Sequence, residues 1–241
     1  SELFQEYSLE QISQYVPRAI VLSNTCGHLI HFAETHDNDR LAKVSHTYAK
    51  MRTGLCALFS ICGGFGFANG VEWFAEEKIN VHNSPGLNWG NPDNQVDYIT
   101  RLHLILREHP AFFSGAQLRL IHENESQALV LLRFNPHQKA RMLVLITPDC
   151  DMQVKAVWLA GTEGGATFPW TDLLSGNTVQ AERRGGKYRI LLKPGEVLAL
   201  SPEKSDLDLL ETQPVGKLSM PGRVLMQKRR ALALDVITTV N

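Results

Sequence analysis

The segment 31–40, which reads H-F-A-E-T-H-D-N-D-R, holds two imidazoles, three carboxylates and a guanidinium within ten residues. It follows the apolar pair Leu29-Ile30. Charges this dense beside an apolar segment are costly to place unless they line a solvated pocket. In chains that alternate strands and helices, active sites form at the carboxyl ends of parallel strands. We therefore expect a buried strand over residues 28–34 and a loop over residues 35–40 that carries chemistry.

A second polar group follows the next apolar run. Residues 65–68 (F-G-F-A) are expected to form a short strand, and Glu72 comes shortly after its carboxyl end. Trp89 lies further on, in a stretch of turn signals, where an aromatic face could stack on a sugar ring.

Simpler interpretations of these residues stay open. Asp37 could cap an Asx turn, and Arg40 could pair with Asp39 at the surface. Glu72 could cap the segment that follows it, and Trp89 could be a packing anchor.

Helical patterns separate these strands. Ser8, with Gln11 three residues later, predicts a helix start, and we expect that helix to end near Tyr15 because Pro17 follows. A second helix after Arg40 is predicted by a 3.6-residue apolar period that ends at Gly63-Gly64, and its face is Met51, Leu55, Leu58, Phe59 and Cys62. A third is expected from Asp93 or Asn94 to Pro110. Strands alternating with helices indicate βα units of a parallel sheet or barrel.

The pattern changes near residues 110–116, where we place a domain boundary. Short β-rich runs without helical period follow, with turn signals between them, and they predict an antiparallel sandwich. These runs are 117–121, 128–135, 140–147, 154–159, 188–192 and 197–201. Residues 214–222 are expected to form a linker and residues 223–239 a helix leading to a further domain. The abrupt, non-Met start indicates a piece of a longer protein.

Composition excludes several classes of function. The formal net charge is -1, so no strong basic surface is expected for nucleic acid or an anionic membrane. No apolar run approaches the roughly 20 residues of a membrane-spanning helix, and no signal peptide is visible. The four cysteines include no C-x-x-C pair, which favours buried thiols in a reducing, cytoplasmic setting. We expect no metal site and no cofactor.

The order of these motifs resembles the α-amylase superfamily (glycoside hydrolase family 13). Phe32-Ala33-Glu34-Thr35-His36-Asp37 is similar to the fourth signature region of that family, at the end of the seventh barrel strand. Gly70-Val71-Glu72 resembles the segment after the eighth strand, and residues 170–176 (W-T-D-L-L-S-G) resemble a turn of its C-terminal sandwich. The resemblance covers about residues 7 to 205.

The resemblance implies a fold class: the last βα units of a (β/α)8 barrel, at residues 1–112, followed by an antiparallel β-sandwich at 113–212. Residues 213–241 would be the linker and helix. Asp37 is then the third catalytic carboxylate, which steadies the distorted, oxocarbenium-like sugar. His36, Arg40, Glu34, Glu72 and Trp89 are the expected substrate-binding residues.

The resemblance also implies what this chain does not carry. The nucleophilic Asp and the acid/base Glu of the family lie on earlier strands, and a retaining glycosidase needs two carboxyl groups about 5 Å apart. We therefore expect a part of a retaining enzyme acting on an α-glucan or maltooligosaccharide, with the rest of the barrel as its partner and little activity alone. The alternative is a non-catalytic carbohydrate-binding or subunit-interaction module.

Overall fold

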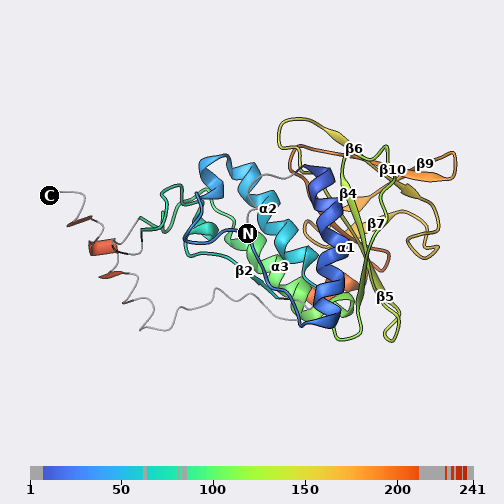
Figure 1. Cartoon of the computed structure of the whole chain (residues 1–241), viewed down its shortest axis with the longest axis horizontal. Coiled ribbons are helices and arrows are strands. Elements are labelled where there is room, and N and C mark those ends of the chain that lie inside the picture. The colour runs from blue at the N-terminus through green and yellow to red at the C-terminus, as the bar shows by residue number, and fades with distance from the viewer. Residues whose placement is uncertain are drawn as a thin grey trace.

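A six-stranded antiparallel sheet lies at the centre of the structure, between a layer of helices and a second sheet (Figure 1). This computed structural model describes residues 8–61, 64–80, 82 and 86–211, together with residues 226, 229–230, 232–234 and 236–237. The predicted linker at 214–222, and Cys62 and Gly63, lie outside the described residues. Those described within the predicted tail helix are helical.

The central sheet has the order β3-β4-β5-β11-β7-β8, and the second sheet has the order β6-β10-β9. The predicted antiparallel sandwich is therefore confirmed. The central strands are β3 (Gln117–Leu120), β4 (Leu129–Asn135), β5 (Ala140–Ile146), β11 (Val197–Ser201), β7 (Trp170–Asp172) and β8 (Thr178–Val179). The second sheet contains β6 (Val154–Leu159), β10 (Lys187–Leu192) and β9 (Glu182–Arg184).

Strands β4 and β5 are buried on both faces. Leu131 and Val144 belong to a core shared with the helices, whereas Val130 and Leu143 belong to a core shared with the second sheet. Successive side chains of a strand point to opposite faces, so a strand between two apolar layers needs an unbroken apolar run.

The helices cover the outer face of the central sheet. They are α1 (Leu9–Thr25), α2 (His46–Phe59) and α3 (Val96–Glu108), and the short α4 (Asp206–Glu211) follows β11. Three 3₁₀ turns connect the elements: η2 (Leu41–Lys43), η3 (Val71–Trp73) and η4 (Pro110–Phe112). The N-cap of α3 is Gln95, and the side chain of Asn94 accepts a hydrogen bond from the Val96 N–H. No helix within the described residues has the length and apolarity to cross a bilayer.

Helix α1 begins at the predicted cap, since Ser8 and Gln11 form a reciprocal capping box. The predicted end near Tyr15 is wrong, because the helix continues through Pro17 to Thr25. An interior proline costs about 3 kcal/mol. The buried face of α1 lies on both sides of Pro17, with Ile12 and Val16 before it and Ala19 after it. Packing of this face against the sheet outweighs the lost hydrogen bond.

Strands β1 (His31–Phe32) and β2 (Phe65–Gly66) form a separate two-stranded parallel sheet. The parallel pairing expected from the sequence is thus present. The prediction of a buried strand over residues 28–34 is wrong, because only two residues are extended and Phe32 is 47% exposed. Among the described residues no third strand joins this sheet, so β1 and β2 pair only with each other.

Arg133 of β4 joins the helical layer to the central sheet. Its side chain is fully buried and donates hydrogen bonds to the carbonyl oxygens of Leu58, Ile61 and Ala111 at 3.0–3.3 Å. Its guanidinium also lies 3.8 Å from the ring centroid of Phe112. These carbonyls stand at the end of α2 and in η4, where the helical pattern leaves acceptors unpaired.

Candidate active-site loop

The loop after β1 is built as a tight turn. The Asn38 N–H donates to the carbonyl oxygen of Thr35 at 3.3 Å, and the Thr35 hydroxyl donates to Asn38 Oδ1 at 2.8 Å. The chain therefore turns back on itself between Thr35 and Asp39, after the end of the strand. Glu34 and Arg40, which flank this turn, point inward and are buried.

Glu34 and Arg40 form a buried ion pair beneath the loop. Arg40 Nη1 lies 2.6 Å from Glu34 Oε1, and the two side chains are 0% and 3% exposed. The second carboxylate oxygen of Glu34 accepts the Leu41 N–H at 2.8 Å, and Arg40 Nη2 donates to the carbonyl oxygen of Asn69 at 2.6 Å. The pair thus closes the loop and ties it to the segment after β2.

The carboxyl ends of β1 and β2 meet at this pair. Burial raises the pKa of Glu34, and the charge of Glu72 adds to that increase, while the Leu41 N–H and Arg40 oppose it. Glu72 itself accepts the Gly70 N–H at 2.9 Å. Glu34, Arg40 and Glu72, which follow the two strands in the sequence, thus lie close together.

Gly70 is required at this meeting point. Its φ of +95° favours glycine, and a Cβ there would stand 2.2 Å from Arg40 Nη2. The backbone can approach the guanidinium this closely only without a side chain.

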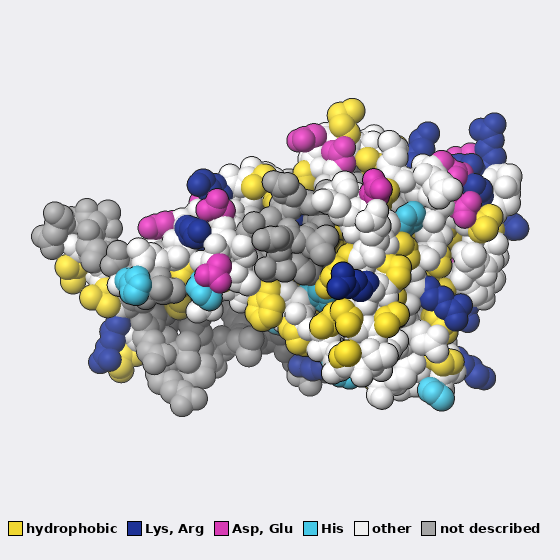
Figure 2. Space-filling model, viewed as in Figure 1, with side chains coloured by type: hydrophobic (Ala, Val, Ile, Leu, Met, Phe, Trp, Pro, Cys, Tyr) yellow, Lys and Arg dark blue, Asp and Glu magenta, His cyan; other side chains and the backbone are white. Residues whose placement is uncertain are grey.

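Asp37 and His36 differ from the residues beneath them because they face solvent. Their side chains are 79% and 58% exposed, and His36 Nε2 lies 3.2 Å from Asp37 Oδ1. Figure 2 shows charged and histidine side chains gathered at the left end of the view, over the loops drawn in blue and teal in Figure 1. The loop therefore presents one carboxylate and one imidazole on an open surface.

Trp89 lies on a different loop and is half-buried. The loop is fixed by Asn88, whose φ is +54° and whose side-chain amide donates to the carbonyl oxygen of Trp73 at 2.9 Å. The indole N–H of Trp89 is buried and has no hydrogen-bond acceptor among the described residues. The loop is held in place, and an unused donor is left on the indole.

The contacts of two histidines near this region, His31 and His46, were not predicted. His31 of β1 is buried, lies 3.1 Å from the Tyr15 hydroxyl and packs against Phe59 at 4.7 Å between ring centroids. Burial lowers its pKa to about 4. His46, at the start of α2, lies 2.6 Å from Asp93 Oδ2 and stacks on Phe74. The partners are 16 to 47 residues apart in sequence, so no local spacing could have signalled these contacts.

A third unpredicted contact joins α3 to α4. His109 donates through Nε2 to Asp206 at 3.0 Å, because its Nδ1 accepts the Ala111 N–H, and Ser201 also bonds to Asp206. Burial raises the pKa of Asp206, but the hydrogen bonds from His109 and Ser201 outweigh it, so the pKa lies below its ordinary value. The serine contacts the carboxylate and not the imidazole, so this is not the nucleophile–base order of a hydrolase triad. Within the described residues no cluster of three or more His, Cys, Asp and Glu is arranged to hold a metal ion.

Comparison with solved structures supports the fold. An α-amylase from Anoxybacillus superposes with a TM-score of 0.59 at 20% sequence identity, over 84% of this chain and 45% of that one. The maltogenic α-amylase AmyB from Thermotoga neapolitana gives a TM-score of 0.61 at 14% identity, over 83% of this chain and 47% of that one. An α-amylase from Lactobacillus plantarum gives 0.56 at 17% identity, over 79% and 42%.

This chain shares its fold with part of the α-amylases. It spans less than half the length of those three proteins. No family model matches the sequence, and no curated protein gives a significant match to it. The α-amylase fold agrees with βα units followed by an antiparallel sandwich, which is the architecture described above.

Proposed function

We propose that this chain forms one side of the active site of a retaining enzyme that acts on α-glucans or maltooligosaccharides. Asp37 is its transition-state-stabilising carboxylate, and His36 is the neighbouring hydrogen-bond donor to sugar hydroxyls. The observation that carries the proposal is the position of Asp37. It is exposed on a braced loop directly after a parallel strand of an α-amylase fold.

Glu34 and Glu72 both have partners within the protein. Glu34 is paired with Arg40 and accepts the Leu41 N–H, and one carboxylate oxygen of Glu72 accepts the Gly70 N–H. Retaining glycosidases need a nucleophile and an acid/base about 5 Å apart on either side of the bond. We propose that both come from barrel strands upstream of this chain, and that Asp37 and His36 act on the strained ring held between them.

We assign Glu34 and Arg40 to positioning. Both were expected from the sequence to bind substrate, but their side chains are at most 3% exposed, so a sugar at the surface does not reach them. Hydrogen bonds that tighten in the transition state require donors and acceptors fixed in advance. The buried pair supplies that fixation for the turn that bears Asp37.

Glu72 and Trp89 keep the substrate-binding roles expected from the sequence as part of this proposal. Glu72 is partly exposed, and the half-buried indole of Trp89 offers part of a ring face. We also propose a cytoplasmic location, which is supported by the free thiols of Cys26, Cys56 and Cys150.

The test is Asp37→Asn in the protein that contains this chain together with the complete barrel. We expect kcat to fall by roughly 10²–10³, the cost of one preorganised electrostatic group, with an unchanged melting temperature. Asp39→Asn is the matched control, because Asp39 is also an exposed acid of the same loop. Full turnover in the Asp37 variant would refute the assignment.

The alternative function is a non-catalytic carbohydrate-binding or subunit-interaction module. It is favoured by the burial of Glu34 in its pair with Arg40, because Glu34 and Glu72 then do not form a free acid and nucleophile pair beside Asp37. Titration of this chain with maltooligosaccharides, beside an activity assay of the protein with its barrel, separates the two. Sugar binding without hydrolysis by the larger protein supports the alternative.

A further inference from the structure

The sandwich has its own cavity, separate from the loop that bears Asp37. It has a volume of about 700 Å³ and opens where the three-stranded sheet meets β8, β11 and the turn between β10 and β11. A cavity of this size suits a small ligand. None of the residues expected from the sequence to bind substrate line this cavity.

The charge of this cavity is positive. Four cations line it, Lys155, Arg184, Arg189 and Lys193, against the two carboxylates of Glu182 and Glu196. Within the part of the chain that the structure describes, none of the four cations forms an ion pair. One carboxylate is used locally, since Glu196 Oε2 accepts the Lys193 N–H at 2.8 Å. The cavity therefore offers more positive charge than the protein itself neutralises.

The remaining lining suits a molecule rich in hydroxyl groups. The amides of Gln153, Asn177 and Gln180 contribute both donors and acceptors, and Ile190 and Leu198 provide an apolar floor. Amide groups beside an apolar surface match a sugar ring, which has hydroxyl edges and apolar faces. The cations match an anion attached to that ring, and phosphate accepts hydrogen bonds from Arg and Lys strongly.

We propose that this cavity binds a phosphorylated sugar. The phosphate lies against Arg184, Arg189 and Lys155, and the sugar hydroxyls contact the amide side chains. The shared chemistry is a phosphate ester on a hexose, whether free in solution or carried on a glucan chain. The proposal does not depend on the role of Asp37.

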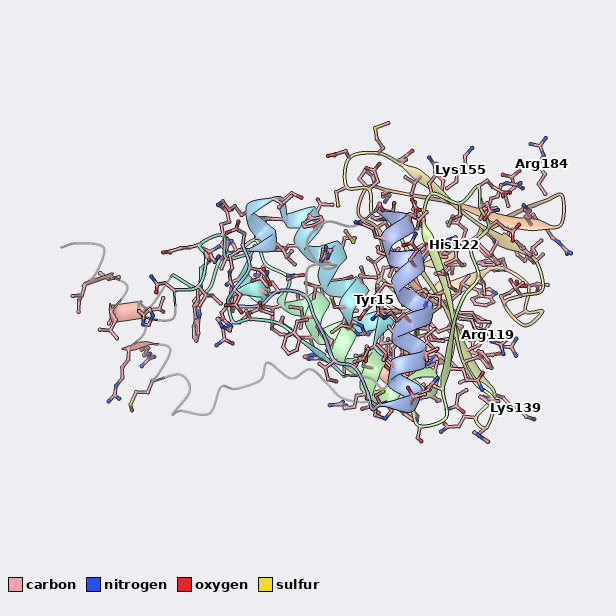
Figure 3. The ribbon with its side chains drawn as sticks, viewed as in Figure 1. Tyr15, Arg119, His122, Lys139, Lys155 and Arg184 are labelled. Atoms are coloured by element: carbon pink, nitrogen blue, oxygen red, sulfur yellow. The ribbon has the colours of Figure 1, made fainter. Side chains whose placement is uncertain are left out.

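A second cavity on the same sandwich provides the comparison. It measures about 380 Å³ and includes Arg119, Lys139 and Arg141. There the guanidinium of Arg119 stacks 4.7 Å from the ring centroid of Phe134, and Arg141 donates to the carbonyl oxygen of Gly164 at 2.5 Å, as Arg189 of the larger cavity donates to the carbonyl oxygen of Arg184 at 2.9 Å. Figure 3 shows Arg119 and Lys139 at the lower right of the sandwich, well away from Lys155 and Arg184 at the upper right.

The experiment is calorimetric titration of this chain with glucose 6-phosphate, a phosphorylated maltooligosaccharide, glucose and inorganic phosphate. We expect glucose 6-phosphate to bind at least tenfold more tightly than glucose or phosphate alone. Its affinity should fall as the salt concentration is raised. The double variant Lys155→Gln/Arg184→Gln should raise its Kd by roughly tenfold or more. The matched variant Arg119→Gln/Lys139→Gln removes two cations from the smaller cavity and should leave the Kd unchanged.

Three outcomes would count against the proposal. Equal affinity for glucose and glucose 6-phosphate would show that the cations take no part. Equal loss in both double variants would show only a response to net charge, and no binding at millimolar concentration would reject the site. Tighter binding of the phosphorylated maltooligosaccharide than of glucose 6-phosphate would identify the glucan as the source of the phosphate ester.

Discussion

The two short parallel strands beside the Asp37 loop, β1 and β2, and the six antiparallel strands of the central sheet are held in opposite ways. Strands β4 and β5 pair over seven residues and are buried on both faces. Strands β1 and β2 pair over two residues, and Ile30 and Phe32 beside this pairing are 49% and 47% exposed. The antiparallel sheet is covered by apolar cores on both faces, whereas the parallel pair leaves apolar surface uncovered.

This difference shows which interactions stabilise each region. An isolated pair of strands is marginal in water, and apolar packing on both faces is what stabilises a sheet. The pairing of β1 with β2 is therefore supported by buried polar contacts: the ion pair of Glu34 with Arg40, and the bond from Arg40 to Asn69. Three predictions test this contrast.

The largest effect is expected where the antiparallel sheet joins the helical layer. Arg133→Ala leaves three buried carbonyl oxygens without their donor, and each unmet acceptor costs about 1–3 kcal/mol. We expect a loss of roughly 5 kcal/mol in the free energy of unfolding, measured by urea denaturation. Arg119→Ala on the neighbouring strand is the control. Its guanidinium is exposed above Phe134, and we expect a loss below about 1 kcal/mol. Similar losses in the two variants would contradict the role given to Arg133.

The next effect concerns the loop. Glu34→Gln leaves the Arg40 guanidinium buried without its counter-charge, and we expect a loss of about 3–4 kcal/mol. Asp37→Asn changes an acid that is 79% exposed, and we expect a change within about 0.5 kcal/mol. Thermal and urea unfolding of the two variants measure this directly. A larger loss from Asp37→Asn would mean that Asp37 supports the fold, which would weaken its assignment to the site.

The smallest effect is a dependence on pH. Burial lowers the pKa of His31 to about 4, whereas a histidine in the unfolded chain titrates near 6.5. Between these values the unfolded chain binds a proton that the folded chain does not, so stability falls as pH falls from about 6.5 to 4. One pKa unit corresponds to 1.36 kcal/mol, which gives at most about 3 kcal/mol.

His31→Asn tests this dependence. The variant should lose that part of the slope while His103 and His122, whose pKa values burial also lowers, contribute equally to both proteins. Measured from pH 7 to pH 4, identical slopes in the two proteins would show that His31 is not the group responsible.

Local patterns were sufficient for much of the sandwich. Strands β6 and β11 have the predicted bounds, because apolar residues in short runs bounded by turn signals specify strands. Strands β7, β8 and β9 were not predicted, since each has only two or three residues and one of them is the charged run Glu182–Arg184. Such short strands are defined by pairing with a neighbour and not by their own sequence.

For the loop, the sequence determined by itself that acids, imidazoles and a guanidinium follow a short strand, and that a parallel partner strand lies further along the chain. Only the tertiary structure decided which of them face outward. Glu34 and Arg40 turn inward because the guanidinium reaches a backbone carbonyl after β2, past a residue that must be glycine. Asp37 and His36 stay at the surface because the tight turn between that pair leaves them no buried partner to meet. Burial depends on contacts between distant segments, and the spacing of residues within one segment does not contain that information.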